Sequence, residues 1–240
     1  MSRERRLTVV FGLNGALLVG LVAVGVVAHS LGVLSAAGDY LADALAIGLS
    51  LFTIRLSRRT PTVKRSYGYE RSTILAALVN AALVVAVMTV VIVVALERLV
   101  NGTPAVHGGP VVAVSALAAV VMFLGVLVLR GDDDLNVRSI LLDTTADAVT
   151  GICVAVTGLV ILVAGGLYWL DPAVALVVAL VIGVRATGLL REVADVLLES
   201  TPKGLVVHAV EAAILEGGAI SEVHDLHIWS LSSDVLLLSA

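Results

Sequence analysis

Long apolar stretches separated by short polar segments dominate the first 200 residues of this chain. Six such stretches occur, each rich in Val, Leu, Ala and Gly, at residues 7–29, 31–54, 73–96, 110–129, 140–167 and 172–190. A helix of about 20 apolar residues spans the hydrocarbon core of a bilayer. Because lipid offers no partners to backbone N–H and C=O groups, stretches of this length are predicted to be transmembrane α-helices.

The pattern changes after Pro202, where the apolar runs become short. A helix is predicted near residues 205–215, and strand-like alternation follows at 222–231 and 234–239. One helix and two strands bury too little to fold alone. We therefore expect an all-α membrane protein with six transmembrane helices over residues 1–200, and a small, apparently truncated α/β domain over residues 201–240.

Composition supports a membrane protein and argues against other classes. The chain is 59% hydrophobic and 14% charged, with a mean hydropathy of +1.08, whereas soluble domains are about 45–50% apolar. A formal net charge of −4 and one cysteine do not fit a disordered chain, a nucleic-acid-binding protein or a disulfide-stapled secreted fold. No nucleophile, phosphate loop or other catalytic constellation is recognisable, so we do not expect an enzyme.

The basic residues predict how the chain is oriented. Of the 15 Lys and Arg residues, all except Arg98 occur in four places. They precede the first apolar stretch, lie between the second and third stretches, lie between the fourth and fifth stretches, or stand near or after the end of the sixth stretch. Cytoplasmic loops carry the excess of Lys and Arg in membrane proteins. Both termini are therefore predicted to be cytoplasmic, which agrees with an even number of spans.

Four aspartates interrupt the apolar stretches in two pairs, Asp39 with Asp43 and Asp143 with Asp147. The i, i+4 spacing places both carboxylates of a pair on one helix face. On membrane-insertion scales, each aspartate at a helix centre raises the free energy of insertion by about 2.5–3.5 kcal/mol, so four would cost on the order of 10 kcal/mol. A divalent cation held between the two helices would offset this cost. Alternatively, some of these carboxylates are capped or solvated at helix ends.

Several motifs give the chain a resemblance to the cation diffusion facilitator family, close to its cobalt-zinc-cadmium resistance type. They are HSL at 29–31, YGYER at 67–71, ILAALVN at 74–80, LNVR at 135–138, DP at 171–172, LESTP at 198–202 and HDLHIWSL at 224–231. The resemblance implies a multi-pass exporter of divalent metal ions in the cytoplasmic membrane, working as a homodimer. It also implies that Asp39, Asp43, Asp143 and Asp147 form the transport site.

The four-aspartate set departs from the zinc-selective members, which usually carry histidine in place of Asp143 and often of Asp39. Carboxylates favour harder ions than imidazole does. Zinc is the first expectation from the resemblance, manganese or iron(II) the alternative, and cobalt and cadmium stay open. Four carboxylates cannot all stay ionised in a low dielectric without a cation, so we expect protons to replace the released metal in an antiport.

The resemblance assigns roles to further residues. Arg71 and Glu199 match a charge interlock between the membrane and cytoplasmic parts that steadies the dimer, although snorkelling to solvent is an equal alternative. His224 and Asp225 match positions that bind regulatory metal in a cytoplasmic metal-binding and dimerisation domain, with a surface role as the alternative. Two other classes stay open: a passive divalent cation channel, and a metal sensor that does not transport.

Overall fold

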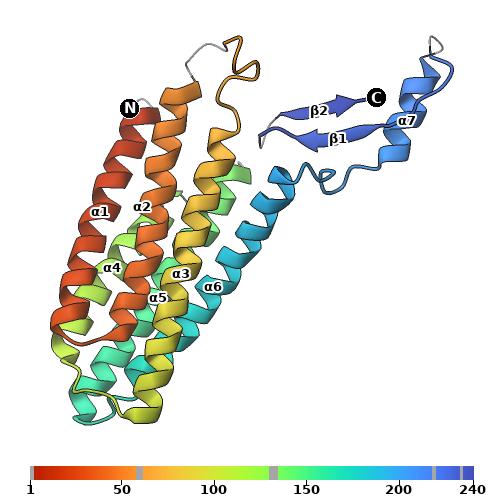
Figure 1. Ribbon diagram of the computed structural model, residues 1–240. Helices are drawn as coiled ribbons and strands as arrows, with labels where there is room; N and C mark the ends of the chain where they lie inside the picture. Colours follow the sequence, from red (N-terminus) through yellow and green to blue (C-terminus); the bar gives the residue numbers. More distant parts are fainter. Residues whose placement is uncertain (1–2, 58–61, 130–134, 218–219, 233–234) are drawn as a thin grey trace.

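The computed structural model describes residues 3–57, 62–129, 135–217, 220–232 and 235–240, without the side chains of 3–10, 50–51, 53–55, 57, 125–129 and 135–144. These residues form α1 (Arg3–Val27), α2 (Leu31–Ser57), α3 (Ser72–Asn101), α4 (Gly108–Leu129), α5 (Leu135–Ala164), α6 (Leu170–Leu197), α7 (Val207–Glu216), β1 (His227–Ser230) and β2 (Leu236–Ser239) (Figure 1). Each of the six predicted apolar stretches thus forms a long helix.

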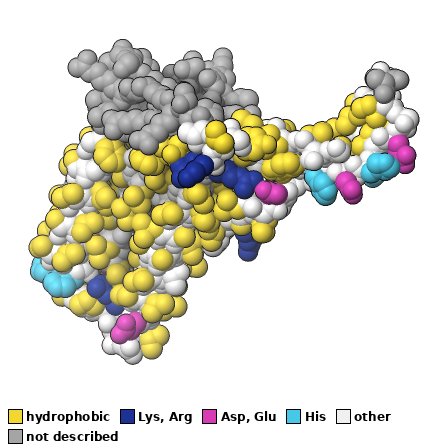
Figure 2. Space-filling view, turned by 45° about the horizontal axis from the view of Figure 1, so that its top comes forward, with side chains coloured by type: hydrophobic (Ala, Val, Ile, Leu, Met, Phe, Trp, Pro, Cys, Tyr) yellow, Lys and Arg dark blue, Asp and Glu magenta, His cyan; other side chains and the backbone are white. Residues whose placement is uncertain are grey.

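The described parts of α2, α3, α5 and α6 contain segments long and apolar enough to cross a membrane, namely Leu31–Leu49, Ser72–Asn101, Thr145–Ala164 and Leu170–Leu197. The described apolar parts of α1 and α4 are shorter, Phe11–Val27 and Gly108–Leu124. Large hydrophobic side chains lie exposed along these helices, as at Val19, Val79, Val90 and Val184. Figure 2 shows hydrophobic side chains over most of the visible bundle surface. Such a surface fits acyl chains rather than water, so the molecule is a multi-pass membrane protein.

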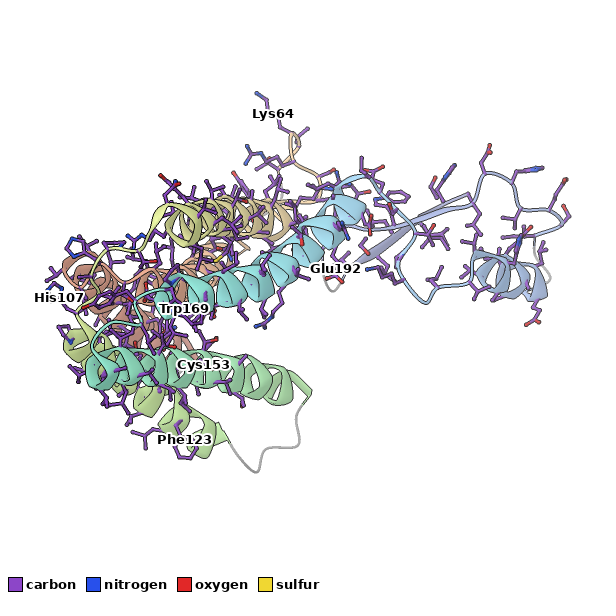
Figure 3. All side chains as sticks on the ribbon, turned by 90° about the horizontal axis from the view of Figure 1, so that it is seen from below. Lys64, His107, Phe123, Cys153, Trp169 and Glu192 are labelled. Atoms are coloured by element: carbon purple, nitrogen blue, oxygen red, sulfur yellow. The ribbon has the colours of Figure 1, made fainter. Side chains whose placement is uncertain are left out.

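The six long helices pack mainly in pairs, and α2 lies between several of them. α3 lies against α6 and α4 against α5, and α2 contacts α1, α3, α5 and α6 (Figure 3). Two apolar clusters form the core. The first joins α1, α2, α4 and α5 and includes Leu21, Val33 and Val154, and the second joins α2, α3 and α6 and includes Met88 and Ala179. Because α2 contributes to both clusters, its position is fixed from several sides.

Glycine permits the close approach of α4 to α5. A Cβ atom at Gly158 would lie 2.6 Å from Cγ1 of Val111, closer than real Cβ atoms come to their neighbours. Without a hydrophobic driving force in lipid, transmembrane helices associate through close packing at small residues. The sequence of α5 therefore holds this helix against α4 at the level of Gly158.

The C-terminal tail contains α7 and a two-stranded antiparallel hairpin, in which His227 pairs with Ser239 and Ser230 with Leu236. None of the α7 side chains is buried. The first strand is shorter than the predicted segment 222–231, because it begins only at His227. Asp225 has a φ of 50°, a left-handed conformation that interrupts an extended chain. The backbone at Asp225 thus explains the late start of β1.

Candidate metal site

Asp39 and Asp43 lie in the interior of α2 rather than at its end. They follow Leu31, where the 27-residue helix begins, by eight and twelve residues, which is about 12 and 18 Å at a rise of about 1.5 Å per residue. Both side chains are half-buried. The alternative that these carboxylates cap a helix end therefore does not hold for α2.

Tyr40 connects the α2 aspartates with α5. Its side chain is 4% exposed and belongs to the apolar cluster of α1, α2, α4 and α5. The charges of Asp147, Asp43 and Asp39 all act on its phenol group. Asp147 lies on α5, which packs against α2. Three of the four predicted ligands thus act electrostatically on one buried phenol from two packed helices.

The fourth predicted ligand, Asp143, lies in α5 one turn before Asp147. The side chain of Asp143 lies outside the described part of the structure. A ligand set that includes Asp143 is therefore also outside it. Among the described side chains, no three His, Cys, Asp or Glu residues are arranged closely enough to hold a metal ion. Asp39, Asp43 and Asp147 therefore all act electrostatically on Tyr40, but the described side chains do not form a ligand set.

Two buried polar groups point to further chemistry in this bundle. The Tyr40 hydroxyl and Oδ1 of Asn80 have no hydrogen-bond partner among the described residues. Asn80 is 8% exposed and lies on α3, which also packs against α2. Buried polar groups are nearly always paired with protein or water. Within the described part of the chain, the Tyr40 hydroxyl and the Asn80 oxygen are thus left to bind water or a hydrated ion.

Sequence reasoning missed two polar residues at this helix. Tyr40 carried no signal other than its place beside Asp39. Asp171 counted only as part of a motif, yet it is 1% exposed and binds the first turn of α2. A signal for Asp171 existed, because Ser30 directly before an apolar helix is a typical N-cap, and Arg98, which stands apart from the other basic residues in the charge pattern, suggests an acidic partner.

Arg71 and Glu199 meet at the other end of the bundle. The Arg71 Nη2 donates to Glu199 Oε1 at 2.6 Å, and the two side chains are 42% and 53% exposed. Glu199 follows the end of α6 with a φ of 58°, a left-handed conformation that usually falls on glycine. The pair joins the start of α3 to the end of α6. Its role as an interlock stays a prediction.

His224 and Asp225 lie exposed in the tail, before β1 begins. The His224 Nδ1 lies 3.6 Å from Glu222 Oε1. Neither residue belongs to a described group of three His, Cys, Asp or Glu side chains that could hold a metal. A regulatory metal at this position also stays a prediction.

The chain is similar to proteins that move metal ions. A family model described as the cation efflux transmembrane domain matches residues 7–198. The cation efflux system protein CzcD of Alcaligenes sp. (strain CT14) is 32% identical over 234 residues, which cover 97% of this chain and 73% of that protein.

Two further relatives carry names that specify the metal. The human proton-coupled zinc antiporter SLC30A2 is 30% identical over 243 residues, covering 95% of this chain and 65% of that protein. The cadmium, cobalt and zinc/H(+)-K(+) antiporter of Bacillus subtilis (strain 168) is 28% identical over 219 residues, covering 90% of this chain and 70% of that protein.

Proposed function

Since this chain belongs to the cation efflux family, the cation diffusion facilitators, we propose that it exports a divalent metal ion in exchange for protons. In this proposal, Asp39, Asp43, Asp143 and Asp147 bind the metal ion near the middle of the membrane. The observation that carries it is that Asp39 and Asp43 on α2 and Asp147 on the packed helix α5 all act electrostatically on one buried phenol. Intramembrane carboxylates that face a bundle interior mark ion pathways.

Exchange for protons follows from the charge of an empty site. Metal binding requires ionised carboxylates, while desolvation and like-charge repulsion favour their protonated forms when the metal has left. An empty site that opens to a more acidic outside would therefore take up protons and carry them inward. The antiporter names of the human and Bacillus subtilis relatives support this coupling.

Zinc is the metal we propose first, because relatives from human and Bacillus subtilis name zinc. The Bacillus subtilis name also includes cadmium and cobalt. An all-carboxylate site lacks the imidazole that favours zinc, so manganese or iron(II) is the second candidate. We further propose cytoplasmic termini and a homodimer, with residues 201–240 as part of its cytoplasmic domain.

Flux into inside-out vesicles tests the transporter against the other classes. An imposed pH gradient, acidic inside the vesicle, should drive zinc accumulation, and a protonophore should abolish it. A channel would let zinc equilibrate whatever the proton gradient, and a sensor would show no flux. Either result would contradict the proposal.

Replacing Tyr40 by phenylalanine should weaken metal binding without abolishing transport. Three aspartates act electrostatically on the phenol, which is not itself a charged ligand, and losing an outer hydrogen-bonding group of a metal site costs about tenfold in metal affinity. We expect KM for zinc uptake to rise about tenfold with a nearly unchanged maximal rate. Tyr168→Phe, before α6, is the matched control. An unchanged KM in Tyr40→Phe would show that the hydroxyl does not act on the metal site.

A charge swap tests the proposed interlock between Arg71 and Glu199. Because both side chains are about half exposed, the pair should contribute only about 0.2–1 kcal/mol to stability. If it couples the two parts of the protein, Arg71→Glu and Glu199→Arg should each lower zinc uptake, and the double variant should restore it. Uptake that stays low in the double variant would favour two side chains that merely reach solvent.

A further inference from the structure

A buried carboxylate of α6 holds the first turn of α2. Asp171 is 1% exposed. Its Oδ2 accepts the N–H of Leu31 at 2.6 Å, and its Oδ1 accepts the hydroxyl of Ser30 at 2.5 Å and the N–H of Gly32 at 3.2 Å. Leu31 and Asp171 are 140 residues apart in the chain. One side chain thus binds the residue before a distant helix and the first two residues of that helix.

Ser30 completes this arrangement. Its Oγ accepts the N–H of Val33 at 3.2 Å while its hydroxyl donates to Asp171. The first N–H groups of a helix have no partner within the helix and carry partial positive charge. In α2, those of Leu31, Gly32 and Val33 are all satisfied by Ser30 and Asp171. Two of these three N–H groups are therefore capped by a side chain of α6.

Arg98 adds α3 and the α1–α2 turn to the same cluster. Its Nη1 donates to the backbone oxygen of His29 at 2.7 Å, and its charge acts on Asp171. His29 has a φ of 56° and separates α1 from α2. The ends of α1, α2, α3 and α6 are thus gathered around one buried carboxylate. We call Asp171, Ser30 and Arg98 the clasp.

Burial along α2 changes between the clasp and the aspartates. Residues 30–33 and 35–38 are buried, whereas 41–43, 45 and 47–49 are half-buried and Ala46 is exposed. Within the buried part, Ser35 donates its hydroxyl to the backbone oxygen of Ala175 at 3.4 Å. A packed segment of α2 and α6 therefore separates Asp39 from the end of the bundle that carries the clasp, near His107 in Figure 3.

We propose that Asp171 is the positioning residue of the outer gate, holding α2 against α6 so that the metal site is closed toward the clasp. This rests on the proposed function, in which that side faces away from the cytoplasm. Release of the metal outward then requires the bonds from Ser30, Leu31 and Gly32 to Asp171 to break together. A carboxylate suits this task because its charge-assisted bonds to a helix terminus are stronger than neutral ones.

Thiol accessibility tests the gate directly. Ser35→Cys places a reporter between the clasp and Asp39, in a Cys153→Ala background because Cys153 is exposed. In sealed vesicles of each orientation, a membrane-impermeant maleimide reaches the reporter from one side only. In Asp171→Asn, labelling from the clasp side should rise about tenfold or more, the factor that a charge-assisted bond represents. Labelling from the opposite side should not change.

Controls separate gating from general loosening. Asp195→Asn removes an exposed acid from the far end of α6 and should leave both rates unchanged. Ser30→Ala removes one of the three bonds to Asp171, so it should give a smaller rise in labelling than Asp171→Asn. It replaces Asp171→Asn in the test if that variant does not fold. Equal rises from both sides, or no rise on the clasp side in either variant, would overturn the gate. Labelling requires no transport, so it stays interpretable if the antiport proposal fails.

Discussion

Replacing Asp43 by asparagine is expected to lower zinc uptake at least about 100-fold, because losing even an outer partner of a metal ligand costs about 10–100-fold and Asp43 is a proposed ligand itself. Asp43 lies in the interior of α2 and acts on the same phenol as Asp39 and Asp147. The amide has nearly the same shape as the carboxylate, but it supplies no charge to the metal. Initial rates of zinc uptake into vesicles under a fixed pH gradient measure the effect.

The stabilising effect of zinc should change as well. A ligand stabilises a folded protein according to how tightly it binds, so zinc should raise the thermal unfolding temperature of Asp43→Asn less than that of the unaltered protein. Asp195→Asn, an acid of α6 away from Tyr40, is the control for both measurements. Uptake within a fewfold of normal in Asp43→Asn would remove this residue from the ligand set.

Replacing Asp143 by histidine is expected to shift the preference from manganese toward zinc by about tenfold or more, because imidazole suits zinc whereas carboxylate suits manganese. Asp143 lies one turn before Asp147 on α5, and the resemblance places histidine there in zinc-selective members. Competition between zinc and manganese for uptake, at equal concentrations and pH, gives the ratio.

Asp143→Asn separates the effect of imidazole from the loss of charge. It should lower uptake of both metals and leave their ratio nearly unchanged. If Asp143→His and Asp143→Asn gave the same ratio, ligand hardness at this position would not determine selectivity.

The long helices could be predicted from apolar length alone, but their ends could not. α3 continues to Asn101 instead of residue 96, through the charged Glu97 and Arg98, until Gly102 turns the chain with a φ of 104°. α6 likewise continues to Leu197 instead of residue 190. Its added residues include Arg191 and Glu192, both good helix formers. Hydropathy finds where lipid can surround a helix, whereas backbone conformation decides where the helix ends.

The aspartate pairs could be found from the sequence, because a charge inside an apolar helix is costly wherever the helix packs. The roles of Tyr40 and Asp171 could not. A phenol beside an aspartate in sequence has no fixed spatial relation to α5, and the bonds from Ser30 and Leu31 to Asp171 span most of the chain. These roles depend on which helices pack together, and helix periodicity does not contain that information.

Proton release on metal binding tests the central claim most directly. Zinc is added to the purified protein in weakly buffered detergent solution, and the protons released per bound ion are counted across a range of pH. We expect release that decreases as pH rises, because fewer carboxylates then hold protons to give up. The Asp43→Asn variant should bind zinc weakly and release fewer protons. Tight binding without proton release, or identical behaviour of the two proteins, would contradict a site in which metal and protons compete for the same carboxylates.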